Sequence, residues 1–124
     1  MNEKVLHTLE YDKITGILKT HIVSEVGLEY ADALHPADSL PDAETLLTQT
    51  EEADAVLRRT GRSPVAAFPD VRPLLSRMHA ALFLSAGELL AVARLMRVSR
   101  EARNVLQSDG AEGLLCNMAN ALPS

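Results

Sequence analysis

Apolar residues recur every three or four positions along almost all of this 124-residue sequence, and this spacing limits its possible folds most strongly. Ile14, Ile17 and Leu18 show the pattern clearly, because residues at this spacing lie on one face of an α-helix. We find no sustained alternation of apolar and polar residues, which is the pattern of a half-buried strand. The sequence therefore predicts an all-α fold of about six or seven helices, with antiparallel neighbours joined by short loops.

Start and stop signals place the predicted helices along the chain. Ser85-Ala86-Gly87-Glu88 matches the capping box, in which the serine and glutamate side chains each accept a hydrogen bond from the other residue's backbone N–H. Pro41 suits the first turn of a long helix, and Gly61 is expected to end that helix. The other expected signals are N-caps at Asp12 and Asp70, helix starts at Ser24 and Ser39, a first-turn proline at Pro73, and a break at Asp109-Gly110.

Two long helices are expected to supply most of the core. The predicted apolar stripe of the helix that starts at residues 39–42 is Ala43, Leu46, Leu47, Ala53, Val56 and Leu57. The predicted buried face of the helix from Ser85 to about Gln107 is Ala91, Leu95, Val98, Ala102, Val105 and Leu106. Between these helices, residues 62–69 contain two prolines and are expected to form an extended linker. We expect all 124 residues to form a single helical domain.

Charge is divided unevenly between the two halves of the chain. Residues 1–57 hold three lysines and twelve acidic residues, whereas residues 58–124 hold nine arginines and five acidic residues. Arg94, Arg97 and Arg100 are the candidates for phosphate contact, and a solvated helix face is the alternative. Arg103 is expected at the edge of the apolar face, with its stem packed and its head in water. A strongly acidic first half does not favour direct binding of nucleic acid.

Motifs for catalysis, cofactors and metals are absent from the sequence. The six glycines match neither the phosphate-binding P-loop nor the dinucleotide fingerprint, and the four histidines lack metal-ligand spacing. His21 interrupts an apolar face and is expected to be a partly buried, hydrogen-bonded residue. The carboxylates of Glu51, Glu52 and Asp54 are expected to form a solvated acidic face. Cys116 has no partner for an internal disulfide, and no apolar run is long enough to span a membrane, so we expect a cytoplasmic protein.

Several segments together resemble one family. The opening MNEKVLHTLEYDKITGIL is similar to the start of the MutS type II family, bacterial MutS homologues that usually end in an Smr nuclease domain. Phe68-Pro69-Asp70-Val71-Arg72-Pro73 resembles the family's hydrophobic-Pro-Asp-hydrophobic-Arg motif, and the resemblance extends over essentially the whole chain. Ala66-Ala67 and Ala80-Ala81 stand where the family commonly has glycines, so the turn near residues 79–84 is expected to be reshaped or replaced by a longer helix.

The resemblance implies an N-terminal core or lever segment of a larger ATPase and endonuclease, without catalysis by the segment itself. For the whole protein it implies ATP and Mg²⁺ as cofactors, and branched DNA or a collided ribosome as the partner. It also implies clamp and ATPase domains in the same polypeptide, homodimers, and roles in suppressing recombination, in DNA repair or in ribosome rescue. A stand-alone helical interaction module and a weak nucleic-acid binder acting through the arginine-rich half remain as alternatives.

Overall fold

The computed structural model describes residues 2–80, 83–108 and 112–124, and these residues form seven helices and no strand. The all-α prediction is therefore confirmed. The helices are α1 (Glu3–Thr8), α2 (Tyr11–Lys19), α3 (Glu25–Asp32), α4 (Leu40–Thr60), α5 (Arg72–Met78), α6 (Ala86–Leu106) and α7 (Leu114–Ala119).

Most helix boundaries follow the signals in the sequence. The Ser85 hydroxyl accepts a hydrogen bond from the Glu88 amide at 3.2 Å, and the Glu88 carboxylate accepts one from the Ser85 amide at 2.8 Å. Gly61 adopts φ 70° and ends α4, which glycine does without the cost of a side chain. The helices expected to start at Ser24 and Ser39 do so, and the side chains of these two serines cap α3 and α4.

Two predicted signals differ from the structure or lie outside the part described. Asp12 does not cap α2: it lies in the first turn, and the residue before the helix is Glu10 with φ 57°. The left-handed turn at Glu10 starts α2 earlier, so that α2 follows α1 almost directly. The break expected at Asp109-Gly110 falls outside the described residues, as does Ala81.

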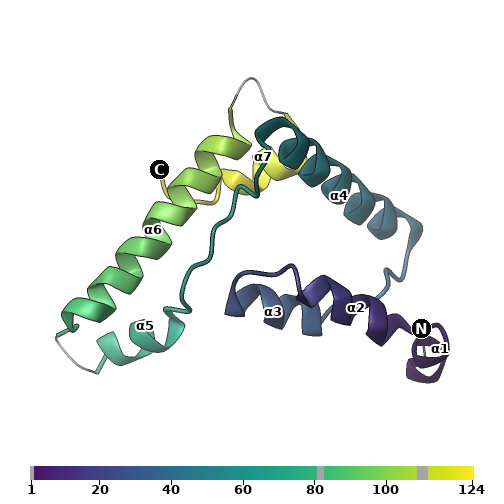
Figure 1. Ribbon diagram of the computed structural model, residues 1–124, viewed down its shortest axis with the longest axis horizontal. Coiled ribbons are helices and arrows are strands. Elements are labelled where there is room, and N and C mark those ends of the chain that lie inside the picture. Colours follow the sequence, from purple (N-terminus) through teal and green to yellow (C-terminus); the bar gives the residue numbers. More distant parts are fainter. Residues whose placement is uncertain (1, 81–82, 109–111) are drawn as a thin grey trace.

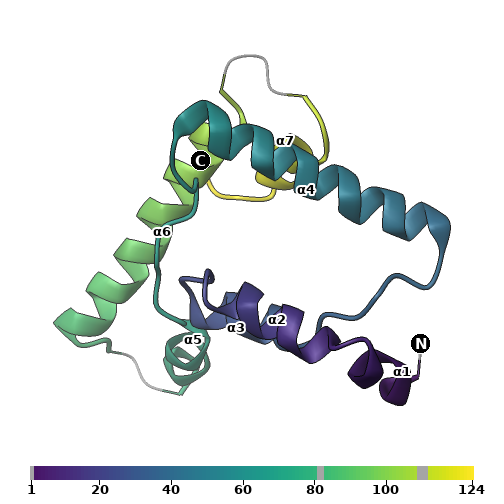
Figure 2. The same ribbon diagram turned by 45° about the vertical axis from the view of Figure 1, so that its right-hand side comes forward.

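The helices form an open arrangement rather than a bundle of antiparallel neighbours. Figures 1 and 2 show α4 and α6 as two long arms that meet near α7, while α1, α2 and α3 form a separate row. α7 packs against both α4 and α6, and α2 packs against both α1 and α3. The long helices α4 and α6 are therefore not the antiparallel neighbours that the sequence predicts, because each packs against α7, whereas α2 does pack against α1 and α3 across short connections.

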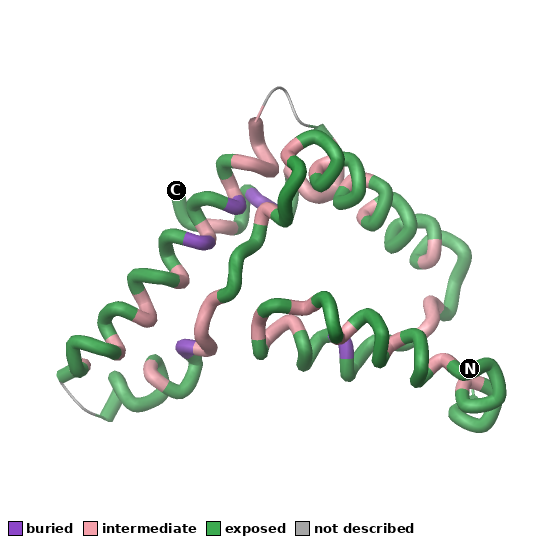
Figure 3. The backbone as a smooth tube through the Cα atoms, viewed as in Figure 1, coloured by how far each residue is buried: buried purple, intermediate pink, exposed green. Residues whose placement is uncertain are grey.

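The core of this open fold is small. Among the described residues, the buried apolar side chains are Ala31, Val71, Val98, Ala102 and Ala119. The accessible surface is 9356 Å², whereas a compact folded chain of this mass exposes about 6,500 Å². The difference of roughly 2,900 Å² means that much apolar surface lacks a covering partner within the chain. Figure 3 shows exposed residues along most of α2 and α4.

The two long helices differ in how well the predicted faces match the structure. On α6, the predicted buried face lies inside, with Val98 7% and Ala102 3% exposed, and the predicted polar face lies outside. On α4, Leu46 and Leu47 of the predicted stripe are 46% and 64% exposed. α4 instead turns a mixed face toward α7, and Val56 is one of the half-buried residues on it. None of the described helices is long and apolar enough to cross a bilayer.

Candidate functional site

The motif at residues 68–73 forms a hydrogen-bonded corner between the extended segment and α5. The Asp70 carboxylate accepts hydrogen bonds from the Arg72 backbone N–H at 3.0 Å and from the Arg72 guanidinium at 2.9 and 2.7 Å. The N-cap of α5 is Val71 rather than the predicted Asp70, whose side chain instead bonds the first helical residue, Arg72, while Pro73 lies in the first turn as predicted. Val71 is 7% exposed, so the corner also contains one of the few buried side chains.

Arg72 links this corner to α3. Its Nη2 donates to Glu29 Oε1 at 2.6 Å, across 43 positions of sequence. The Arg72 guanidinium holds the pKa of the Asp70 carboxyl below its usual value. The hydrogen bonds to Asp70 and then to Glu29 raise the pKa of Arg72 itself. The motif therefore acts as a structural joint that holds the start of α5 against α3, and the Arg72 side chain is at its centre.

This joint predicts a pH-dependent contribution to stability. Because the pKa of Asp70 is lowered in the folded chain, the ion pair stabilises the fold above the unfolded-state pKa. That stabilisation falls away as the pH drops below about 4, through the lowered pKa. We expect Asp70→Asn to lower the midpoint temperature of unfolding at pH 7. Near pH 2 the midpoint of this variant should equal that of the unsubstituted chain.

The control for this prediction is Asp38→Asn, at an exposed aspartate in the segment between α3 and α4. Thermal unfolding followed by circular dichroism from pH 2 to pH 7 measures the difference for both variants. A constant difference between Asp70→Asn and the parent over this range would contradict the assigned role.

The three candidate phosphate-binding arginines are not equivalent. Arg94 Nε donates to the Ala67 backbone oxygen at 3.1 Å and so holds the extended segment against α6. Arg97 and Arg100 are exposed on the outer face of the same helix. Arg103 departs from the expectation of a head in water, because its Nη1 donates to the Leu122 backbone oxygen at 2.8 Å. Two of the four arginines therefore make contacts within the fold.

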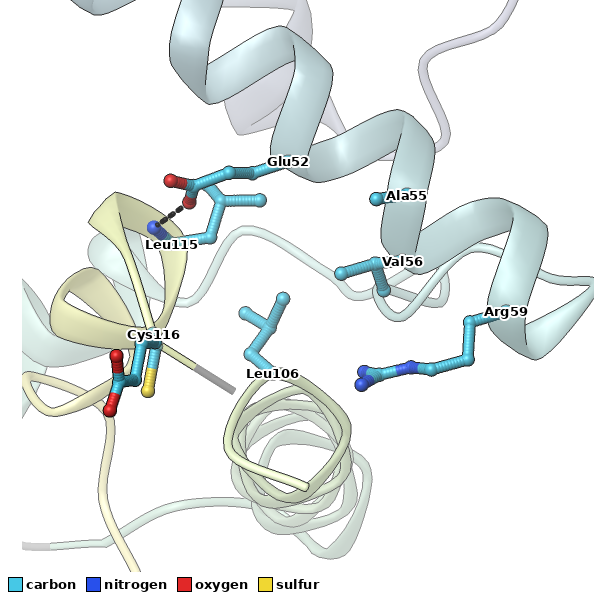
Figure 4. Close-up of a pocket in the computed structure, with 8 residues that line it drawn as sticks. Glu52, Ala55, Val56, Arg59, Leu106, Leu115 and Cys116 are labelled. Carbon is cyan, nitrogen blue, oxygen red and sulfur yellow. Dashed lines mark hydrogen bonds between the residues drawn. The ribbon is translucent and has the colours of Figure 1, made fainter. Parts of the chain in front are cut away.

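A second joint lies where α4, α6 and α7 meet. The Glu52 carboxylate accepts hydrogen bonds from the Leu114 and Leu115 backbone N–H groups at 3.0 and 2.8 Å. Figure 4 shows the bond to Leu115. These amides belong to the first turn of α7, whose N-cap, Gly113, has no side chain to accept them. Glu52 therefore caps α7, and the predicted solvated acidic face is wrong at this residue. Glu51 and Asp54 are exposed as predicted.

Arg59 caps the C-terminal end of α6, just as Glu52 caps the N-terminal end of α7. Its Nη2 donates to the Val105 backbone oxygen at 3.0 Å, and its Nη1 donates to the Ser108 backbone oxygen at 3.5 Å. A cation near the C-terminus of a helix satisfies unpaired carbonyls and complements the helix dipole. Sequence reasoning missed this role, and it missed Glu52 too. One usable signal is Gly113, since a glycine N-cap has no side chain of its own to accept the first amides of the helix.

The cavity at this joint has a volume of about 220 Å³ and a mostly apolar lining. Val56, Leu106 and Leu115 face it, with Arg59 and Cys116 at its margins (Figure 4). Within the described ranges, no group of three or more His, Cys, Asp or Glu side chains is placed to hold a metal ion. His21 is exposed rather than partly buried, because α2 ends at Lys19 and His21 lies in the turn that follows. The arrangement supports helix packing rather than chemistry.

Comparison with known proteins gives one consistent group of relatives. Endonuclease MutS2 of Geobacillus kaustophilus is 42% identical over 106 residues, which is 86% of this chain and 14% of the relative. Endonuclease MutS2 of Clostridioides difficile is 33% identical over 112 residues, 90% of this chain and 14% of the relative. Endonuclease MutS2 of Lactiplantibacillus plantarum is 36% identical over 100 residues, 81% of this chain and 13% of the relative.

The chain thus spans about one seventh of the length of these curated relatives. No family profile matches the sequence. No solved structure matches it either. The three alignments nevertheless cover 86%, 90% and 81% of the chain. The chain is therefore homologous to a segment of the Endonuclease MutS2 proteins.

Proposed function

We propose that this chain serves as the N-terminal helical scaffold segment of a MutS2-type endonuclease. The observation that carries the proposal is its alignment over 86% of its length with 14% of a named endonuclease. In this proposal, catalysis belongs to other parts of the polypeptide, which bind ATP and Mg²⁺ and cut nucleic acid. The whole protein acts in the cytoplasm on branched DNA or on a collided ribosome, and so suppresses recombination, repairs DNA or rescues ribosomes.

The shape of the chain supports a scaffold role. Among the described residues, the buried side chains are all alanine or valine, while Leu40, Leu90 and Phe83 are more than 70% exposed. An isolated domain of this size normally covers such residues with its own elements. In the proposed whole protein, the clamp and ATPase parts of the same polypeptide pack on these surfaces.

The two joints support the same role. Arg72 connects the corner at residue 70 to α3, and Glu52 with Arg59 connects α4 to α7 and α6. Each joint uses a charged side chain that bonds to a partner far away in sequence. Such bonds fix the orientation of long helices, which a lever or core segment needs in order to transmit movement between domains.

The experiment is a blot of the source cells with an antibody raised against this chain. We expect a band several times larger than 13.4 kDa. Material precipitated by the antibody should also hydrolyse ATP and cut branched DNA. Excess purified chain, added as a competitor for the antibody, must remove both activities from the precipitate. A single band at 13.4 kDa would contradict the proposal and favour a stand-alone helical interaction module.

A further inference from the structure

Six of the helices fall into two groups, each held together by its own packing. Helix α2 packs against α1 and α3, and α7 packs against α4 and α6. As far as the structure describes them, no helix of the first group packs as closely on a helix of the second. Figures 1 and 2 show the first group lying apart from α4. We call α1, α2 and α3 the N-terminal row, and α4, α6 and α7 the arm unit.

A single backbone segment leads from the N-terminal row to the arm unit. Residues 33–39 connect α3 to α4, form no helix, and include no buried residue. Little packing therefore opposes a change of backbone angles in this segment. Hinges between rigid parts of proteins are usually a few loop residues of this kind. The segment can act as a hinge between the two groups.

An ion pair makes a second connection between the two groups. Arg72, at the start of α5, donates from Nη2 to Glu29 Oε1 of α3 at 2.6 Å. Within the described part of the chain, it is the one side-chain hydrogen bond between the N-terminal row and residues 40–124. At the other end of α5, Arg77 pairs with Glu88 of α6. Helix α5 therefore bridges the row and the arm unit with a charged pair at each end.

The Arg72–Glu29 pair is well oriented but open to water. The Asp70 carboxylate accepts hydrogen bonds from Arg72 Nε at 2.9 Å and from Nη2 at 2.7 Å, which fixes the guanidinium before Glu29 binds it. The side chains of Arg72 and Glu29 are 54% and 60% exposed. A hollow of about 270 Å³ lies beside the pair, lined by Glu29, Tyr30, Ala33 and Arg72. Because salt screens a pair this exposed, it can open without unfolding the helices around it.

We infer that the Arg72–Glu29 ion pair is a latch that holds the N-terminal row in one orientation, and that its opening lets the row turn about residues 33–39. Both groups stay folded when the latch opens, because the packing of α2 and of α7 does not involve it. Asp70 is a positioning residue for the latch. The inference concerns this chain itself and does not rest on the proposed function.

The test measures distances between spin labels in the full 124-residue chain by double electron–electron resonance. Cys116→Ser first removes the native thiol. Labels at Ile17→Cys of α2 and Arg100→Cys of α6, both exposed positions, then report the distance from the row to the arm unit. Labels at Leu47→Cys and Arg100→Cys report a distance within the arm unit. Between 50 and 500 mM NaCl, we expect the first pair to gain a second range of distances and the second pair to stay unchanged.

Glu29→Gln removes the charge from the latch and keeps the size of the side chain. We expect it to raise the fraction of molecules in the second distance range about two- to fivefold at 50 mM NaCl, and to remove the salt dependence. Glu25→Gln is the matched control, because Glu25 is exposed and lies one turn earlier on α3. It should behave like the unsubstituted chain, and circular dichroism checks that each variant keeps its helices.

Three results would overturn the inference. The first is a row-to-arm distance that does not respond to salt in the unsubstituted chain, a measurement that needs no variant of the latch. The second is an equal effect of Glu29→Gln and Glu25→Gln, or a salt dependence that persists in Glu29→Gln. The third is an equal change in both label pairs, which would mean that the arm unit itself changes shape.

Discussion

Ala119→Asp is expected to detach α7 from α4 and α6. Ala119 is the most buried residue of the described chain, at 1% exposed, and it ends the helix that packs against both long arms. A carboxylate there loses its water without gaining a partner, and it also lies at the negative end of the helix dipole. We expect a loss of about 3 kcal/mol or more in the free energy that holds α7 in place.

Hydrogen exchange of the α7 backbone amides measures this effect directly. A loss of 3 kcal/mol corresponds to a fall in protection of more than about 100-fold. Ala121→Asp is the matched control, because residue 121 is exposed and lies just beyond the helix. Equal protection in the two variants would show that α7 does not hold the long helices together.

Gly113→Ala is expected to break the contact between α4 and α7 from the other end of the helix. Gly113 has φ 126°, which an alanine adopts only with strain. An added Cβ would also overlap the Glu52 carboxylate, so Glu52 must move and give up the amides of Leu114 and Leu115. Strain and lost charged hydrogen bonds together cost about 2 kcal/mol or more.

Two further variants check the cause of this effect. Gly16→Ala should leave α7 unchanged, because Gly16 lies inside α2 and its added Cβ meets no other atom within 4 Å. Glu52→Gln should reduce exchange protection at Leu114 and Leu115 in the same direction as Gly113→Ala. The double variant should add little to either single change, since both remove the same contact. Simple addition of the two losses would contradict a shared cause.

Helix boundaries were the part of the fold that sequence reasoning predicted best. Ser85 and Glu88 form their capping box, and Gly61 ends α4 in the left-handed conformation. These signals act within four residues of chain, so the local sequence contains all the groups involved. The prediction of Asp12 as an N-cap was wrong because Glu10 adopts the left-handed conformation. That conformation is rare for a residue with a side chain, and no local sequence pattern predicts it reliably.

The family motif was found from sequence, whereas its physical role was not. Phe68–Pro73 marked the resemblance, and the alignments with Endonuclease MutS2 proteins bear it out. The bond from Arg72 to Glu29 spans 43 positions, and no local pattern connects those two residues. Arg94 was read as a candidate for phosphate contact, but its side chain reaches the backbone of Ala67.

Local sequence was enough to establish that the chain is helical and where most of its helices start or end, because capping and 3.6-residue periodicity depend on near neighbours. It did not establish which face of a helix is covered. The stripe on α4 with Leu46 and Leu47 has the correct period, yet α7 packs beside Glu52 instead. The packing of α7 on this side of α4 depends on contacts between Glu52 and residues 62 and 63 positions further along the chain. It leaves the apolar stripe of α4 uncovered and available to a partner.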